Sequence, residues 1–213
     1  MRILHTSDWH IGRQFHNVSL LDDQRIVLDQ IIHIIQSCDV DVLLIAGDVY
    51  DRSVPPANAV ALLDDVLHRI CNELSVPVIM IAGNHDSADR LSFGARQLTG
   101  AGLHIVGPLS ESWSPVVLSD KWGEVAFYGI PYVDPVIVNG VYGTRCGSHD
   151  DAISYLTGSI HADIERRGGS DRVVVLSHCF IDGGDECDSE RPLSMGGADK
   201  VSPKHFEAFS YTA

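Results

Sequence analysis

The feature that most constrains the fold of this chain is an alternation of short apolar runs with amphipathic helical patterns. Residues 40–46, 76–82 and 172–177 are rich in Val, Ile and Leu, and each run is shorter than an ordinary helix. Runs of this kind are typical of parallel strands that are covered on both faces. Strands that alternate with helices along the chain predict an α/β fold.

Helical patterns lie between and after these strands. An acidic capping signal opens a helix over residues 22–37, and the proline pair at 55–56 introduces a second helix, because proline is well tolerated in a first helical turn. Further helices are expected over residues 89–98 and 150–167. The sequence thus predicts a helix after each strand of the first hundred residues.

The remaining segments read as strands and loops. Residues 2–6 predict a first strand, and residues 103–106, 115–119 and 124–130 predict strands in an antiparallel arrangement, because turn residues separate them. Residues 181–201 are polar and rich in glycine, and we expect a long loop there.

The second helix is apolar on two sides. One stripe has helical spacing and by default packs on the sheet: Val60, Leu63, Leu67, Ile70 and Leu74. Ala59, Leu62 and Val66 form another apolar face. A helix that is apolar on two sides is either deeply buried or in contact with another subunit.

Composition and cysteine content bound the class of protein. The 213 residues are 45% hydrophobic and 21% charged, which is ordinary for a globular domain. No apolar run is long enough to span a bilayer, and no secretion signal is visible at the start. Five cysteines form no C-x-x-C pair, so we interpret them as reduced thiols and expect a cytoplasmic protein without a membrane partner.

The net charge of −14 argues against a chain that binds nucleic acid through its overall field. A domain that gathers aspartates around divalent cations is, however, much less acidic once the cations are bound. Contact with a polyanion would then depend on metals and on local basic side chains.

Side chains that bind metals follow directly after four of the predicted strands. They are Asp8 and His10, then Asp48, then Asn84 and His85, and finally His178. Because the carboxyl ends of parallel strands meet at one edge of a sheet, these side chains are expected to share one crevice. Carboxylate, amide and imidazole ligands without cysteine suit Mn²⁺, Fe²⁺ or Zn²⁺ rather than a structural zinc site.

Details of this pattern support a pair of metals. Asp48 is placed to bridge two cations, and we expect Gly47 and Gly83 to let the backbone turn sharply before the ligands. Each residue also has a simpler interpretation: Asp48 could cap a helix, Asn84 could be a turn residue, and His178 could be a surface histidine. Asp86 is expected to make local hydrogen bonds rather than to bind metal.

Three motifs together resemble a known family. Asp8-x-His10, Gly47-Asp48-x-x-Asp51 and Gly83-Asn84-His85-Asp86, followed by His178, match the calcineurin-like metallophosphoesterases. The segments MRILHTSDWHIG, AGDVYDRSVPPA, IAGNHDSADRL and SMGGADKVSPKHFEAFSY further resemble the nuclease subunits of bacterial SbcCD-type complexes. This resemblance implies a four-layer αββα sandwich and two Mn²⁺ ions, with Mg²⁺, Fe²⁺ or Zn²⁺ as alternatives. It also implies cleavage of DNA ends and hairpins in repair and recombination, together with an SbcC-type ATPase.

The resemblance also implies roles for single residues. Asp8 and His10 would hold the first metal, Asp48 would bridge, and Asn84 and His178 would hold the second metal. His85 would contact the scissile phosphate, and Asp51 would orient His85. Helices of the region around the second helix form a dimer interface in the family, so a homodimer is expected.

One departure from the family pattern limits these expectations. The family has a later G-H-x-H motif that completes both metal shells, and none occurs in these 213 residues. We therefore expect residues 1–213 to be a metallophosphoesterase domain that is incomplete at its C-terminus and lacks the capping and ATPase-binding regions. We expect such a fragment to be weakly active or inactive.

Two other functions remain open at this point. Arg52 extends the second motif to G-D-x-x-D-R, which resembles phosphoprotein phosphatases, where the arginine binds a phosphate monoester. A phosphoprotein phosphatase or a cyclic-nucleotide phosphodiesterase is therefore the alternative enzyme. A non-catalytic scaffold with the same fold is the third hypothesis.

Overall fold

The computed structural model describes residues 1–110, 112–169, 172–184 and 200–213, and the chain divides into two compact units. The first unit is Met1–Pro108 together with Ala213, and the second unit is Leu109–Thr212. Most of the loop predicted over residues 181–201 lies outside the described residues.

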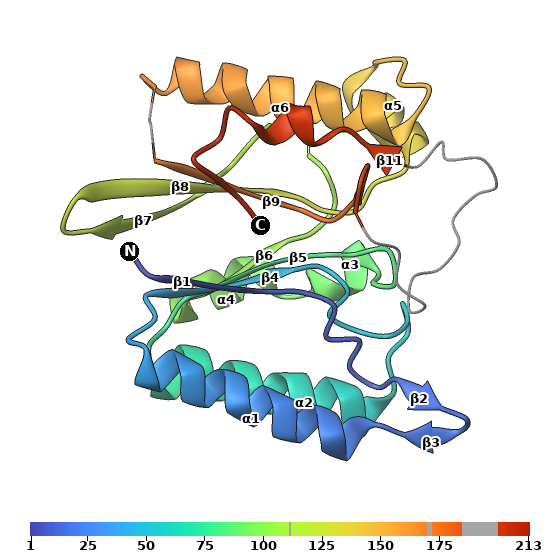
Figure 1. The fold of residues 1–213 in the computed structure, drawn as a ribbon, viewed down its shortest axis with the longest axis vertical. Helices are drawn as coiled ribbons and strands as arrows, with labels where there is room; N and C mark the ends of the chain where they lie inside the picture. The colour runs from blue at the N-terminus through green and yellow to red at the C-terminus, as the bar shows by residue number, and fades with distance from the viewer. Residues whose placement is uncertain (111, 170–171, 185–199) are drawn as a thin grey trace. The chain divides into compact units, whose positions relative to one another are not determined.

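The first unit is built on a parallel sheet of four strands in the order β1-β4-β5-β6 (Figure 1). Its strands are β1 (Ile3–Thr6), β4 (Val42–Ala46), β5 (Val78–Ile81) and β6 (Leu103–Val106). The central strands β4 and β5 are buried at every residue, as expected for strands covered on both faces. The predicted central strands are thus confirmed.

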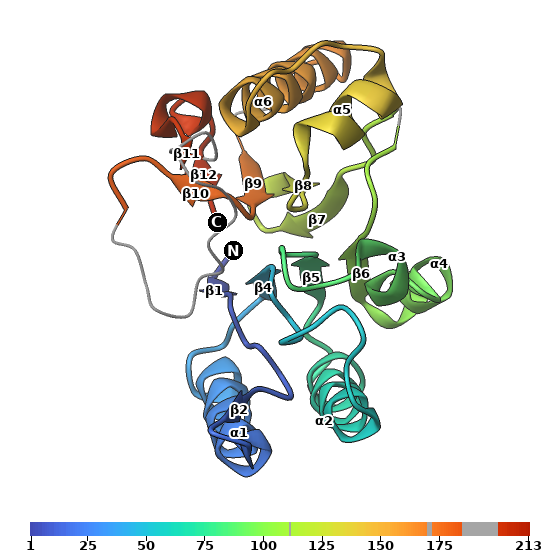
Figure 2. The ribbon, with the colours of Figure 1, turned by 90° about the vertical axis from the view of Figure 1, so that its right-hand side faces the viewer.

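Helices α1 (Leu21–Ser37) and α2 (Ala57–His68) lie on one face of this sheet (Figures 1 and 2). Both were predicted, and α2 continues into a π-helical turn, Arg69–Glu73. The face of α2 that suggested a subunit contact is buried inside the chain: Ala59, Leu62 and Val66 are each at most 1% exposed. That face packs in this unit's own core and therefore gives no support for a dimer; the homodimer stays a prediction.

The segment before β6 differs from the prediction. The helix expected over residues 89–98 is two short helices, α3 (Ala88–Leu91) and α4 (Ala95–Leu98), separated at Gly94, which has a left-handed φ of 76°. A 3₁₀ turn, Thr99–Ala101, follows. β6 then pairs parallel to β5, so the antiparallel prediction for this strand was wrong. The helical turns supply the crossover that a parallel strand requires.

The second unit is built on a mixed sheet of four strands in the order β12-β9-β8-β7. Its strands are β7 (Val116–Asp120), β8 (Gly123–Ile130), β9 (Val173–Ser177) and β12 (Tyr211–Thr212). β7 and β8 pair antiparallel, as predicted, whereas β9 is parallel to both of its neighbours. Smaller elements of the chain are β2 (Gln14–Phe15), β3 (Val18–Ser19), β10 (Phe180–Ile181), β11 (Lys200–Val201) and the 3₁₀ turn Pro203–Phe206.

Two helices, α5 (Pro135–Tyr142) and α6 (His149–Arg166), lie on one face of the second sheet (Figure 2). α6 was predicted and α5 was not. The sequence does carry a signal for the start of α5, an N-cap aspartate followed by proline. The Asp134 carboxylate accepts the Val136 N–H at 2.7 Å, and Pro135 occupies the first turn.

Each unit therefore combines a sheet with helices, and the predicted α/β class with parallel sheets is confirmed. Within the described ranges, no helix combines the length and the apolar character needed to cross a membrane. Cys38, Cys71, Cys146 and Cys179 are free thiols.

Candidate metal centre

Two loops of the first unit, which follow β1 and β4, are joined by main-chain hydrogen bonds. The Asp8 N–H donates to the Gly47 carbonyl at 3.1 Å, and the His10 N–H donates to the Asp48 carbonyl at 2.9 Å. The Ile11 N–H continues the ladder to Val49 at 3.0 Å. The first two predicted ligand loops therefore run side by side beyond the ends of their strands.

Three of the predicted ligand residues have an unusual backbone conformation. Asp8, His10 and Asp48 have φ values of 58°, 43° and 49°, in the left-handed region that residues other than glycine seldom adopt. Each such residue costs about 1–3 kcal/mol of strain, which persists only where surrounding contacts enforce it. Strain of this kind is concentrated at functional sites.

The two glycines before the ligands serve different purposes. Gly47 has a φ of 96°, which matches the sharp turn that was predicted. Gly83 instead allows a close approach: a Cβ added there would lie 2.1 Å from Asp48 Oδ1 and 2.3 Å from the Asp48 nitrogen. Only glycine lets the loop after β5 come this close to Asp48.

Asp48 lies at the centre of the cluster and is 2% exposed. Its Oδ1 accepts the main-chain N–H of His85 at 2.8 Å. Its Oδ2 lies 3.6 Å from His10 Nε2 and 3.8 Å from His85 Nε2. His10 Nε2 is also 3.7 Å from Asp8 Oδ1. Two imidazole nitrogens and two carboxylates thus converge on one small space.

These atoms fit a divalent cation. Asp8, His10 and Asp48 offer one ligand atom each within 4.8 Å of one another, and so do His10, Asp51 and His85. Separations of 3.6–3.8 Å exceed those of ordinary hydrogen bonds. They suit atoms that share a cation, because each metal–ligand bond is about 2.1 Å long. Oxygen and imidazole donors together favour Mn²⁺, Fe²⁺ or Zn²⁺.

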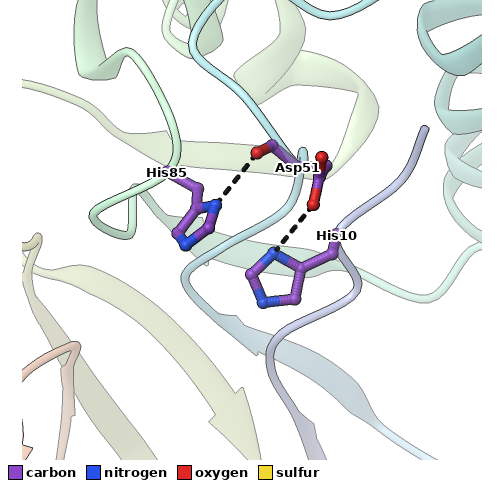
Figure 3. Close-up of side chains that lie close together, drawn as sticks. All are labelled: His10, Asp51 and His85. Atoms are coloured by element: carbon purple, nitrogen blue, oxygen red, sulfur yellow. Dashed lines mark hydrogen bonds and ion pairs between the residues drawn. The ribbon is translucent and has the colours of Figure 1, made fainter. Parts of the chain in front are cut away.

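The surroundings of the other ring nitrogen of His10, Nδ1, also fit a histidine that binds a metal through Nε2. His10 is 6% exposed, and its Nδ1 is buried with no hydrogen-bond partner among the described residues. The nearest acid is Asp51, whose Oδ1 lies 4.0 Å away (Figure 3). A histidine that binds metal through one nitrogen normally donates a hydrogen bond from the other, and Asp51 lies close to the position of such an acceptor.

The contact between His85 and Asp51 differs in kind from the one expected. His85 Nδ1 lies 2.9 Å from the main-chain oxygen of Asp51, whereas the Asp51 carboxylate extends toward His10 (Figure 3). A carbonyl oxygen only accepts, so His85 carries a proton on Nδ1. Its Nε2 then faces Asp48 Oδ2, and the ring packs edge-on against the His10 ring with centroids 4.6 Å apart.

Asp86 joins the loops after β4 and β5. Its carboxylate accepts the N–H groups of Gly83 at 2.9 Å, Tyr50 at 2.9 Å and Val49 at 3.0 Å. Burial raises the pKa of the Asp86 carboxyl above its ordinary value, although these three hydrogen bonds act in the opposite direction. The prediction of a local hydrogen bond is confirmed for Gly83, whereas the bonds from Val49 and Tyr50 join Asp86 to a distant part of the chain.

The other predicted site residues are placed as follows. Asn84 is half-buried in the loop after β5, directly before His85. Arg52 is exposed, with a guanidinium nitrogen 4.0 Å from Asp51 Oδ2. His178 follows β9 in the second unit and donates its N–H to the Ile130 carbonyl at 3.3 Å. Its role as a ligand of the same metals stays a prediction.

Sequence reasoning missed one residue that contacts the site's backbone. Gln24 of α1 makes three hydrogen bonds to the loop after β1. A signal was present, because Gln24 lies four residues before Leu28 and eight before Ile32, on the buried face of the helix. A polar residue on an otherwise apolar stripe indicates a buried hydrogen-bonding role.

Comparisons with known proteins agree with this geometry. A profile of the calcineurin-like phosphoesterases matches residues 1–198. A relative in Staphylococcus saprophyticus, which is named as a subunit of the nuclease SbcCD, is 33% identical over 210 residues. The matched residues are 98% of this chain and 54% of that protein. The chain therefore spans about half the length of the curated relative it matches.

Proposed function

Because the chain belongs to the calcineurin-like phosphoesterases, a family of metal-dependent enzymes, we propose that it hydrolyses phosphodiester bonds of DNA. The substrates would be DNA ends and hairpins, and the reaction would depend on Mn²⁺ and serve repair and recombination. The observation that carries the proposal is the position of Asp48 Oδ2 within 3.8 Å of Nε2 of both His10 and His85. The match to a relative named as part of a nuclease supports DNA as the substrate.

The chain's own residues would hold two cations. Asp8 and His10 would bind one ion, Asp48 would be shared, and Asn84 and His178 would bind the other. Bound divalent cations would supply the Lewis acidity that activates water and offsets the charge of the phosphate. The main-chain hydrogen bonds between the loops after β1 and β4 would help to hold Asp8, His10 and Asp48 in position for this role.

His85 is suited to a role beside the ions rather than as a ligand. The Asp51 carbonyl holds the proton on Nδ1, so the ring orientation is fixed and Nε2 faces the cluster. In its doubly protonated form, His85 would donate from Nε2 to a phosphate oxygen or to the leaving oxygen. Asp51 would serve both histidines, through its carbonyl for His85 and its carboxylate for His10.

We propose that residues 1–213 belong to a metallophosphoesterase domain, of which they are not the whole, and that the protein works with an SbcC-type ATPase in the cytoplasm. The support is the match over 98% of the chain to one component of a complex named SbcCD.

The reaction is tested with the full-length protein, Mn²⁺ and two substrates, a DNA hairpin and a small phosphomonoester. We expect cleavage of the hairpin, its loss in His85→Ala, and its retention in Arg52→Ala. Faster hydrolysis of the monoester that requires Arg52 would instead identify a phosphatase. Arg52 is the informative variant because its side chain is exposed beside Asp51.

We also propose that the chain forms a homodimer through a surface other than the buried face of α2. The loop between α3 and α4 exposes Phe93 at 88%, and α4 exposes Leu98 at 38%. We take these two side chains, which one short segment exposes, as the proposed contact with a second copy. The mass in solution at micromolar concentration tests this proposal: we expect a dimer that Phe93→Asp converts to a monomer, and a monomeric wild type would contradict it.

A further inference from the structure

The loop after β1 depends on a side chain from a different element. Gln24 Nε2 donates to the Trp9 carbonyl at 3.1 Å and to the His10 carbonyl at 2.7 Å. Gln24 Oε1 accepts the Gly12 N–H at 3.0 Å. One carboxamide therefore contacts three consecutive peptide units, those that join residues 9 to 10, 10 to 11 and 11 to 12.

Two of these peptide units flank His10. Fixing both planes fixes the φ and ψ angles between them, and His10 has the smallest of the left-handed φ values in this loop, 43°. The orientation of the Cα–Cβ bond, from which the imidazole extends, follows from the backbone on both sides of His10. We infer that Gln24 is a positioning residue, whose carboxamide holds the backbone that aims His10 at the metals; this inference rests on the proposed function.

The chemistry of the contacts requires an amide. Two carbonyl oxygens need a donor and one N–H needs an acceptor, and glutamine provides both on one planar group. A glutamate of the same length would place negative charge against the Trp9 and His10 carbonyls. A methionine would fill the space without either function.

The position of Gln24 makes the support rigid. It lies in the first turns of α1, whose residues Leu28, Ile32 and Ile35 are buried against the sheet. Gly12 is packed on the other side, because a Cβ there would lie 3.0 Å from the Ala59 Cβ. The loop is therefore held between α1 and the start of α2.

The test compares Gln24→Met with Gln30→Met, because Gln30 is exposed on the same helix. We expect Gln24→Met to weaken Mn²⁺ binding about tenfold or more, as is typical when the support of a metal ligand is lost. The EPR spectrum of bound Mn²⁺ should change as well, whereas Gln30→Met should match the wild type. Circular dichroism verifies that each variant is folded before its metal affinity is measured. If Gln24 only stabilised the fold, Gln24→Met would lower the melting temperature and leave the dissociation constant of Mn²⁺ unchanged.

Amide hydrogen exchange in the absence of metal separates this inference from the proposed function. The Gly12 amide should exchange faster in Gln24→Met and stay protected in Gln30→Met, whether or not the wild type binds Mn²⁺. Gln24→Glu keeps the acceptor for the Gly12 N–H and loses the donor to the Trp9 and His10 carbonyls. This variant should therefore retain protection of the Gly12 amide but bind Mn²⁺ weakly. It replaces Gln24→Met if Gln24→Met does not fold. Wild-type exchange at Gly12 together with wild-type Mn²⁺ affinity in Gln24→Met would overturn the inference.

Discussion

Two aspartates, one in each unit, are almost completely buried, and their surroundings differ. Asp48 in the first unit is 2% exposed and Asp163 in the second is 1% exposed. Asp163 accepts hydrogen bonds from Tyr128 at 2.8 Å, from Arg167 at 2.6 Å and from Arg166. Burial opposes its charge, but these three donors outweigh burial and hold the pKa of Asp163 below its ordinary value.

Asp48 has imidazoles where Asp163 has guanidinium groups. Its Oδ2 faces Nε2 of both His10, a proposed metal ligand, and His85, which is proposed to act beside the ions. The second unit therefore neutralises its buried carboxylate within the chain, whereas the carboxylate of Asp48 faces imidazoles in an arrangement that suits the proposed cations. The partners of a buried acid, and not its burial, distinguish a structural site from a chemical one.

The strongest test of this comparison is Asp48→Asn. The amide oxygen can still accept the His85 N–H, so the fold should persist while the charge is lost. Loss of a residue that only supports a metal ligand typically lowers metal affinity or activity about 10- to 100-fold. Asp48 is itself a proposed ligand, so we expect Mn²⁺ affinity and the rate of hydrolysis to fall more than about a hundredfold. Calorimetric titration of Mn²⁺ measures the change, and an unchanged affinity would remove Asp48 from the metal site.

Gly83→Ala tests the close approach to Asp48. The new Cβ would overlap Asp48 Oδ1, so the loops after β4 and β5 must separate. We expect a loss of at least about 2 kcal/mol in the free energy of unfolding, together with weaker metal binding. The control is Gly158→Ala in α6, where the added Cβ meets no atom within 4 Å. That change should stabilise the protein by about 0.5–1 kcal/mol in urea denaturation; equal losses at both positions would contradict the close-contact argument.

Asp163→Asn tests whether Asp163, unlike Asp48, contributes to stability alone. Loss of the charge weakens the contacts with Arg166, Arg167 and Tyr128, and we expect about 2 kcal/mol lower stability. Mn²⁺ affinity of the folded protein should stay at the wild-type value. A change in affinity that matched that of Asp48→Asn would show that the distinction between the two aspartates is mistaken.

Replacement of Asp150 should have the smallest effect on stability, and this effect should depend on pH. The Ser202 N–H donates to its carboxylate at 2.8 Å, and His205 Nε2 lies 2.8 Å from the same oxygen. The Ser202 hydrogen bond, with His205 as a further partner, lowers the pKa of Asp150, although burial opposes this shift. A lowered pKa in the folded state adds stability above the unfolded value of about 3.9, and this stability is lost as pH falls through the folded value. The melting temperature of wild type should therefore exceed that of Asp150→Asn at pH 6, and the difference should shrink below about pH 4.

The sequence by itself determined the central strands of the first sheet, the long helices and the chemical types at the site. Apolar runs at residues 40–46 and 76–82 became β4 and β5, and the polar residues after them became the loops of the cluster. This succeeded because a strand buried on both faces and a helix with one apolar face each leave a pattern within a few residues of chain. The rule that parallel strand ends meet at one edge then placed Asp8, His10 and Asp48 together.

Tertiary structure alone decided which atoms meet. The contact of Gly83 with Asp48, the use of the Asp51 carbonyl by His85, and the contacts of Gln24 all join residues that are distant in the chain. The parallel pairing of β6 and the burial of Leu62 likewise depend on what lies beside each element. A local pattern records which side of an element is apolar, whereas the identity of its neighbour is fixed only when the chain packs and each buried polar group must find a partner.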